Sequence, residues 1–551
     1  MNKRVIVAAA IGNCVHVAGI YNFLRLAENE GYKTVFLGPA VSIEEYINEV
    51  KKYKPEIAAV SYRLTPSALE NILKELKTKI SENNLTNIKW VFGGNEPTAK
   101  IAKKSGIFHA IFDGTSGDDF TIGFLRGGVY NIKKEYYPDT LIKRIDQKYP
   151  YPIIRHHFGL SSLDKTVEGI KKIADSKVLD VISIAPDQNA QEHFFDKKYD
   201  KSLDGAGGVP LRGKEDFVKL YEASRRGNFP LLRCYSGTND IFKMAEMLVE
   251  TINNAWAAIP LCWYNVLDGR GPRPVNISIE ENQKLMKWHG ERGIPVEVNE
   301  SHHWSLRDAH DVIGVATAFL AAYNAKKMGV NTYIAQYMFN VPASISPKMD
   351  LAKMLAKIEL IESLEDDNFR VFRQARAGLA SFPSDLLEAK GQLASSAYLS
   401  MAIKPHIYHV VGYCEAHHAA TAEDIIESVK ISKAIIKNAL SGMPDMTQDK
   451  EVVKRKNHLI KETKILLEAI KSLNSKSDDP LSDPNVLSKA IKIGLLDAPH
   501  LKGNKNAKGL LKTKVINGAC YAFDYENNRI ISEEERVDKI LNEYKKAVIV
   551  A

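Results

Sequence analysis

The sequence predicts two α/β domains in series, a doubly wound flavodoxin-like parallel sheet followed by a (β/α)8 TIM barrel, with a C-terminal α+β extension. Short apolar runs alternate with helical patterns up to about residue 113, and eight further apolar runs recur between residues 150 and 440. A charged amphipathic helix and a mixed region follow them. The expected boundaries are 1–130, a linker over 131–149, a barrel over 150–440 and an extension over 441–551.

Composition restricts the classes of partner. The chain has 551 residues, of which 45% are hydrophobic and 26% charged, and a net charge of +8 without a dense basic block, which argues against nucleic acid. No apolar run reaches the roughly 20 residues that cross a bilayer, so we expect a cytoplasmic protein with no membrane contact. The five cysteines are far apart and form no C-x-x-C pair, so neither a zinc site nor a disulfide framework is expected.

The first domain is predicted from five strands joined by short connections and helices, as in flavodoxin-like folds. The expected strands are Arg4–Ala10, Thr34–Leu37, Ile57–Ser61, Ile88–Phe92 and Ala110–Phe112, with helices starting at His16 and over Ile43–Tyr53, Pro66–Ile80 and Pro97–Lys104. Ligands of such sheets bind at the carboxyl ends of the strands. The turns at that edge are therefore the candidate site.

These turns carry small and hydroxylated residues. The candidates are His16, Gly19, Ser61, Thr65, Gly93, Gly94, Gly114 and Thr115. Glycines and hydroxyls suit a large flat ligand with a buried tail, since they allow close backbone approach and a few fixed hydrogen bonds. A histidine on such a turn suits a metal or cofactor ligand, although a plain surface histidine has the same pattern.

A histidine, a glycine three residues later, a serine loop and a Gly-Gly pair, in this order, resemble the B12-binding domain, most of all the small subunit of glutamate mutase. The resemblance implies that His16 is the lower axial cobalt ligand. It also implies that Ser61 and Thr65 line the pocket of the displaced cofactor tail, flanked by Gly93, Gly94, Gly114 and Thr115. The family pattern is Asp-x-His-x-x-Gly, whereas Cys14 stands at the first position here, with Asn13 as a neighbouring substitute. A receiver-type domain, the alternative, would need an acidic cluster that this sequence lacks.

The barrel is predicted from eight apolar runs with helical patterns between them. They are Pro152–Gly159, Val178–Pro186, Pro230–Gly237, Ile259–Asn265, Ile294–Glu300, Val330–Met338, Phe369–Arg376 and His406–Cys414. Arginines, histidines and tyrosines follow these runs, which predicts a polar mouth suited to a carboxylate-bearing substrate. In the extension we expect helices over Asp449–Leu473, Leu487–Ile493 and Glu533–Ala547 and a hairpin near Val515–Phe523.

This part resembles the large, epsilon subunit of glutamate mutase. The motifs that carry the resemblance are Leu232-Arg233-Cys234-Tyr235-Ser236-Gly237, Tyr264-Asn265-Val266, Phe382-Pro383, Glu415-Ala416 and Gly494-Leu495-Leu496-Asp497-Ala498-Pro499. The resemblance implies that Arg155, Arg233 and Tyr235 hold the substrate, that Tyr264 faces the reacting carbon and that Glu415 holds the ribose of an adenosyl group. Three family positions differ here: the second arginine falls near Gln191, the third falls at Tyr235 unless the loop shifts so that Arg233 serves, and the substrate-contacting glutamate falls at Ala258.

The hypothesis from these resemblances is an adenosylcobalamin-dependent isomerase that rearranges a small carboxylate-bearing substrate other than glutamate. The cobalamin cobalt would be bound by His16, the cofactor would carry the radical chemistry, and the barrel would bind the substrate. Two alternatives stay open: a corrinoid methyltransferase, whose B12 domain usually follows a four-helix cap, and a non-catalytic cobalamin sensor, which Cys14 and Ala258 would suit. The sequence also leaves a homodimer open.

Overall fold

The computed structural model describes residues 4–114, 118–127, 136–235 and 237–550. The chain divides into two compact units, Met1–Tyr136 and Tyr137–Ala551. Within the described ranges, no helix combines the length and the apolar character that a membrane crossing requires.

The first unit is a five-stranded parallel sheet in the order β2-β1-β3-β4-β5, which confirms the flavodoxin-like prediction. The strands are β1 (Val5–Ala10), β2 (Lys33–Phe36), β3 (Ile57–Ser61), β4 (Lys89–Gly93) and β5 (Ala110–Phe112). The helices are α1 (Ala18–Asn29), α2 (Ile43–Tyr53), α3 (Pro66–Glu82), α4 (Glu96–Ser105) and α5 (Asp118–Leu125). Side chains alternate along β1, so that Val7 and Ala9 belong to one apolar core and Ile6 and Ala8 to another.

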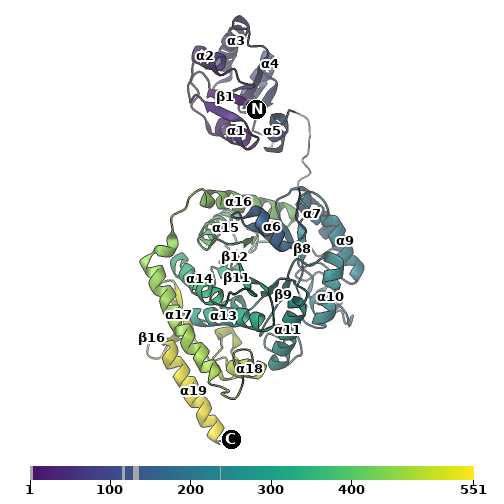
Figure 1. Ribbon diagram of the computed structural model, residues 1–551, viewed down its shortest axis with the longest axis vertical. Helices are drawn as coiled ribbons and strands as arrows, with labels where there is room; N and C mark the ends of the chain where they lie inside the picture. Colours follow the sequence, from purple (N-terminus) through teal and green to yellow (C-terminus); the bar gives the residue numbers. More distant parts are fainter. Residues whose placement is uncertain (1–3, 115–117, 128–135, 236, 551) are drawn as a thin grey trace. The chain divides into compact units, whose positions relative to one another are not determined.

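The second unit contains eight parallel strands surrounded by helices (Figure 1). The strands are β6 (Ile153–Phe158), β7 (Val181–Ile184), β8 (Leu231–Arg233), β9 (Ala257–Ile259), β10 (Val296–Val298), β11 (Thr332–Phe339), β12 (Arg370–Ala377) and β13 (Ile407–His409). Their order is β8-β7-β6-β13-β12-β11-β10-β9, and within these described strands β8 and β9 are not paired, so the barrel is nearly closed. The fourth strand ends six residues earlier than the prediction, Ile259–Asn265, because Leu261–Asn265 form a buried loop instead.

Helices connect consecutive strands of this barrel. They are α7 (Leu163–Asp175), α8 (Gln188–Glu192), α9 (Lys214–Ser224), α10 (Ile241–Ile252), α11 (Val275–Gly290), α12 (Ser301–Ser305), α13 (Asp311–Lys327), α14 (Pro347–Glu362), α15 (Leu386–Met401) and α16 (Ala422–Leu440). Three successive helices, α13, α14 and α15, are predominantly apolar and bury more than one face, as expected of helices that lie between a barrel and further structure.

The barrel interior is layered, with an apolar floor under a polar layer. The floor consists of Ile153, Val181, Leu231, Trp256, Ile334, Phe372 and Ile407. Two residues further along several strands, inward-facing positions are polar: Arg155, Ser183, Arg233, Glu297, Gln336, Gln374 and His409. Barrel interiors are usually filled by branched apolar residues, so this polar layer marks the carboxyl end of the strands as the site.

Part of the predicted linker, 131–149, belongs to the core of the second unit. Helix α6 (Leu141–Lys148) buries Leu141 and Ile145 against the barrel floor. The side chain of Arg144 is 2% exposed and donates to the carbonyl oxygens of Pro138, Asp180 and Phe229. The amphipathic pattern of this helix is short and was obscured by the surrounding Lys, Tyr and Asp residues.

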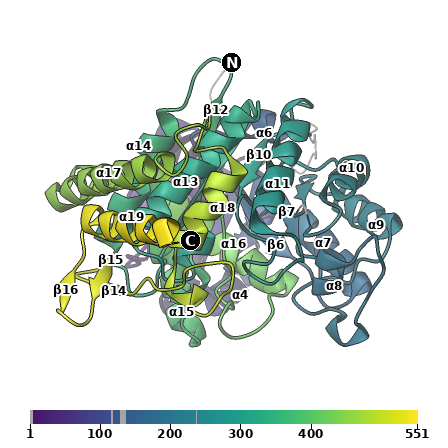
Figure 2. The same cartoon turned by 90° about the horizontal axis from the view of Figure 1, so that it is seen from below.

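The extension packs against the barrel helices. It comprises α17 (Lys450–Lys471), α18 (Pro484–Ile493), β14 (Thr513–Ile516), β15 (Ala519–Asp524), β16 (Arg529–Ile530) and α19 (Glu533–Val550). Figure 2 shows α17 and α19 side by side, and α17 also packs on α13 and α14. Arg455 of α17 donates to Asp311 of α13 at 2.9 Å, which ties the extension to the barrel wall. The predicted helices and hairpin of this region are confirmed.

Candidate functional site

A cavity of about 370 Å³ opens at the carboxyl edge of the sheet in the first unit. Its lining comes from the ends of β1, β3, β4 and β5 and from α1. It includes His16, Gly19, Ser61, Gly93, Gly94 and Gly114, together with apolar side chains such as Phe23, Leu26 and Phe112. The structure therefore brings together six of the predicted residues of this domain around one glycine-rimmed cavity of mixed polar and apolar lining.

His16 lies on the exposed turn between β1 and α1. Its Nδ1 atom is 3.9 Å from Sγ of Cys14, a buried thiol that is only a weak hydrogen-bonding group. The other candidate partner, Asn13, instead accepts a hydrogen bond from Tyr62 Oη at 3.2 Å. If His16 binds a metal through Nε2, its Nδ1 atom therefore faces the Cys14 thiol, and the Asn13 side chain is not its partner.

An unpaired hydroxyl and two open glycine positions in this cavity fit a bulky ligand. Ser61 Oγ is buried without a hydrogen-bond partner, so a ligand atom could satisfy it. An added Cβ at Gly19 or Gly114 would meet nothing within 4 Å, which leaves space above the turn. Gly94, in contrast, is crowded: an added Cβ would lie 2.7 Å from Phe92 Cε1 and 2.9 Å from the carbonyl oxygen of Tyr62.

Two predicted residues lie outside this set. Thr65 is the residue before α3, is exposed and does not line the cavity, because the chain turns away from the sheet edge there. Thr115 lies outside the residues that the structure describes.

A second cavity, of about 260 Å³, lies at the mouth of the barrel. Its lining contains five arginines and one carboxylate: Arg155, Arg233, Arg270, Arg307, Arg376 and Glu297. Tyr235, Tyr264, Asn299, His302, His303 and Gln336 complete its polar lining. All four residues predicted to contact the substrate, Arg155, Arg233, Tyr235 and Tyr264, therefore meet here.

Glu297 is the centre of a buried charge network below this cavity. Its Oε2 atom accepts from Trp256 Nε1 at 2.7 Å and lies 3.4 Å from Arg155 Nη1 and 3.5 Å from Arg233 Nη2. The two guanidinium groups hold the pKa of this carboxyl below its usual value against the opposing effect of burial. Nε of Arg155 and Nε of Arg233 are buried without a hydrogen-bond partner, so donors remain for a bound anion.

The imidazoles at the mouth are neutral. Burial, reinforced by nearby arginines such as Arg155, Arg307 and Arg376, lowers the pKa values of His157, His302 and His303 well below their usual range. The fixed positive charge of the cavity is therefore carried by arginines.

Tyr264 is held in an unusual backbone conformation, with φ at 65°. Asp268 stabilises this turn by accepting from the backbone nitrogen atoms of Tyr264 at 3.2 Å and Asn265 at 3.0 Å. Left-handed backbone at a non-glycine residue is costly, and it is concentrated at sites where a side chain must be aimed. The turn presents Tyr264 to the cavity.

Glu415 does not line the arginine cavity. It follows β13 and lines a neighbouring cavity of about 330 Å³, with His156, Cys414, His417 and His418. Arg376, which lines the arginine cavity, is close enough to Glu415 to interact with it electrostatically.

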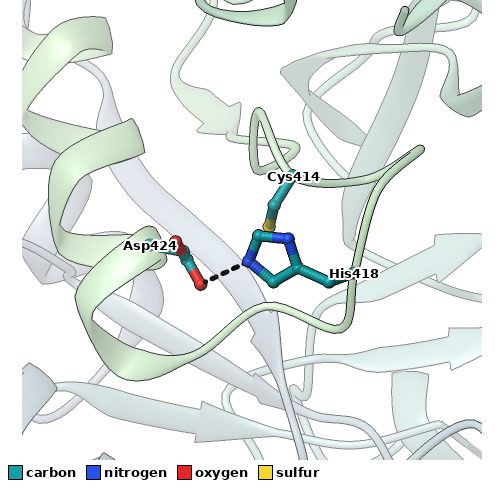
Figure 3. Close-up of side chains that lie close together, drawn as sticks. All are labelled: Cys414, His418 and Asp424. Carbon is teal, nitrogen blue, oxygen red and sulfur yellow. Dashed lines mark hydrogen bonds and ion pairs between the residues drawn. The ribbon is translucent and has the colours of Figure 1, made fainter. Parts of the chain in front are cut away.

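Three side chains of that loop region lie close together (Figure 3). Donor atoms of Cys414, His418 and Asp424 are within 4.8 Å of one another, and His418 Nε2 lies 3.1 Å from Asp424 Oδ2. Asp424 also accepts from the backbone nitrogen of Thr421 at 3.0 Å and from Tyr413 Oη at 2.9 Å. Because these bonds already satisfy the carboxylate, we assign the cluster a role in holding the loop.

Comparison with protein families matches the first unit and the C-terminal part of the second. Residues 4–117 match the B12 binding domain, and residues 280–543 match the methylaspartate mutase E chain (MutE). The chain joins a B12-binding domain to a methylaspartate mutase E-chain domain. It is thus a cobalamin-binding protein of the glutamate/methylaspartate mutase family, which is a family of cobalamin-dependent isomerases. The B12-binding match contains the cavity with His16.

Solved structures that resemble this fused mutase-family chain include a novel cobalamin-binding protein from Desulfitobacterium hafniense DCB-2, with 23% identity, a TM-score of 0.21 and coverage of 23% of this chain and 59% of that protein. Another is a glycoside hydrolase described as an enzyme targeting pectin rhamnogalacturonan II, with 9% identity, a TM-score of 0.33 and coverage of 85% and 56%. The chain covers less than two thirds of either protein, and at such TM-scores these likenesses do not bear on its function. No curated protein matches the chain.

Sequence reasoning missed several residues of the mouth in the mutase domain. Glu297, Arg270 and Arg307 line the arginine cavity but were not among the predicted site residues. Glu297 had a detectable signal, because a charged residue between Val296 and Val298 in a strand must face the opposite side from both. The two arginines follow β9 and α12 in loops, where charged residues are common, so nothing in the sequence distinguishes them.

Proposed function

We propose that this protein is an adenosylcobalamin-dependent mutase that catalyses a 1,2-rearrangement of a small carboxylate-bearing substrate other than glutamate. The observation that carries the proposal is the arginine-rich cavity at the carboxyl end of the barrel, in a chain that also has a B12-binding domain. Adenosylcobalamin, when bound, supplies the radical chemistry through its cobalt–carbon bond.

The first unit would hold the cofactor through its own residues. His16 would offer an imidazole nitrogen to cobalt from the exposed turn, and Ser61 Oγ would bond the buried tail. Gly19 and Gly114 would leave room for the ligand because their open faces carry no side chain. The crowding at Gly94 supports a turn whose shape depends on glycine.

The barrel residues would bind and orient the substrate and exclude water. Arg155 and Arg233 have unpaired N–H donors for a carboxylate, and Tyr235 presents a hydroxyl beside them. Tyr264 would face the reacting carbon from its fixed turn. Glu415, in the neighbouring cavity, would hold the ribose hydroxyls of the adenosyl group.

The test is electron paramagnetic resonance of the full chain loaded with adenosylcobalamin and mixed with candidate small carboxylic acids. We expect an organic-radical signal that requires substrate, and isomerised product by mass spectrometry. Imidazole nitrogen splitting that disappears in His16→Ala would support the assigned ligand. If no acid gives a radical or product, the mutase proposal is wrong, and a methyl carrier or sensor explains the fold better.

A further inference from the structure

We infer that the substrate is a small acid with two anionic groups and no ammonium group. This inference rests on the proposed function, since it concerns the substrate of the same cavity. It starts from a charge imbalance in the lining. Five arginines, Arg155, Arg233, Arg270, Arg307 and Arg376, face one carboxylate, that of Glu297.

The carboxylate of Glu297 already has partners within the protein. It is 1% exposed and binds Trp256, Arg155 and Arg233. A substrate ammonium that paired with Glu297 would have to displace one of these groups and would sit against two guanidinium groups. Like charges at such distances in a desolvated site repel strongly, so this arrangement is unfavourable.

Two further carboxylates, on the segments that follow β9 and β10, are also used by the protein. Glu300 accepts from the backbone nitrogen atoms of Leu261 and Cys262 and from Trp304 Nε1. Asp268 accepts from two backbone nitrogen atoms in the Tyr264 turn and lies 3.9 Å from Arg270. Neither group lines the cavity, so among the described lining residues no carboxylate is free for a cation.

The cavity offers donors for anions and one neutral acceptor. Nε of Arg155 and Nε of Arg233 are buried without hydrogen-bond partners. Because Arg270, Arg307 and Arg376 come from other elements, a second anionic group would find its own guanidinium partners. Gln336 Oε1 is a buried acceptor without a donor, and a neutral substrate hydroxyl or amide would satisfy it without adding positive charge.

Isothermal titration calorimetry on the full chain, as purified and loaded with adenosylcobalamin, tests the inference with matched acids. One series is glutarate, 2-hydroxyglutarate and glutamate, and the shorter series is succinate, 2-hydroxysuccinate and aspartate. In at least one series we expect the dicarboxylate or the hydroxy acid to bind at least tenfold more tightly than the amino acid. Arg376→Gln should weaken that binding at least tenfold. Arg373→Gln is the matched control, because Arg373 lies on the same strand but pairs with Glu362 outside the barrel.

Each result decides between the two claims. If an amino acid binds as tightly as its dicarboxylate, or if none of the six acids binds, the inference is wrong. If the loaded chain isomerises aspartate, the inference fails while the mutase proposal stands. If it isomerises glutamate, the inference fails together with the exclusion of glutamate, and only the mutase reaction itself stands. If a dicarboxylate binds with the expected preference but no acid is ever isomerised, the inference stands and the mutase proposal fails.

Discussion

Nη2 of Arg155 lies 2.7 Å from Nε2 of His157, and this contact fixes which ring nitrogen carries the proton. A guanidinium only donates, so Nε2 accepts and the neutral ring is protonated at Nδ1. Nδ1 then donates to Tyr235 Oη at 3.0 Å. The hydrogen of the tyrosine hydroxyl then has two acceptors in reach, Nε2 of the same ring at 3.2 Å and an anion bound in the arginine cavity.

Tyr235→Phe removes that donor. We expect anion affinity to fall about tenfold or more, since a hydrogen bond to a charged group contributes about 1.5–3 kcal/mol. Calorimetry with the preferred dicarboxylate measures the change. Tyr408→Phe is the control, because its hydroxyl is buried and unpaired on the outward face of β13. Equal losses in both variants would contradict the role of Tyr235.

Ala258→Glu tests the charge balance of the barrel. Ala258 pairs in register with Glu297 and is 1% exposed, so a glutamate there adds a second interior carboxylate. We expect the preference for dicarboxylate over amino acid to fall at least tenfold, with a loss of stability of about 1–3 kcal/mol from overpacking. Ala258→Gln has the same size without the charge. If the two folded variants show the same preference, charge does not set it.

Cys14→Asp restores the carboxylate of the family pattern beside His16. A charged acceptor in place of a thiol 3.9 Å from Nδ1 should raise the basicity of the imidazole. We expect cobalamin to bind about tenfold more tightly in an absorbance titration, with stronger imidazole nitrogen splitting. Cys14→Asn, which lacks the charge, serves as the control. Unchanged binding in Cys14→Asp would argue against ligation by His16.

Gly94→Ala and Gly93→Ala form a matched pair in the B12-binding domain. An added Cβ at Gly94 would clash with Thr98, Phe92 and the Tyr62 carbonyl, whereas at Gly93 the nearest atom, Ser61 Cβ, is 3.9 Å away. We expect Gly94→Ala to cost about 1–3 kcal/mol of stability and to weaken cobalamin binding, because the turn must shift. Scanning calorimetry and cobalamin titration measure both effects. Gly93→Ala should remain close to wild type in stability.

Stability of the barrel should fall as the pH drops from 7 to 5. His289 is 2% exposed, and burial lowers its pKa from 6.5 to about 4. Between pH 6.5 and 4 the unfolded chain therefore binds a proton at this histidine that the folded chain does not. The free energy of unfolding keeps its full value above pH 6.5 and falls below it, by about 2 kcal/mol at pH 5 for one such group. Asp424 and Glu533 have pKa values lowered to about 2, so their losses begin at lower pH.

Urea unfolding at several pH values between 5 and 7 measures this effect. His289→Gln should reduce the slope of unfolding free energy against pH, because one buried titrating group is removed. His500→Gln, at the surface, should not reduce it. An unchanged slope in His289→Gln would show that this histidine is not the group that resists protonation.

Most of the fold could be predicted because its strands are buried on both faces and therefore form continuous apolar runs. The exceptions have physical reasons. The apolar run that predicted the fourth barrel strand continues through Leu261, Cys262 and Trp263. These residues are apolar because they form a buried loop after β9, so their apolar character does not indicate a strand. Helix α6 is only eight residues long, too short for its pattern to stand out from the polar residues around it.

Part of the site could be predicted, mainly those residues whose direction is determined by their place in a strand. Arg155 and Arg233 lie within short barrel strands, so alternation directs both into the interior. Arg270 and Arg307 reach the same cavity from loops whose paths depend on tertiary packing. The position of Glu415 in a neighbouring cavity likewise depends on the loop after β13, which strand periodicity does not determine.

Between β8 and β9 the barrel is held by one backbone hydrogen bond beside the strands and by an ion pair inside it. Ala255 N, just before β9, donates to the carbonyl oxygen of Leu232 in β8 at 2.9 Å, and Arg233 at the end of β8 lies 3.5 Å from Glu297 on β10. An anion that draws Arg233 toward itself competes with that attraction. The same guanidinium therefore serves both the closure of the barrel and the binding of an anion inside it.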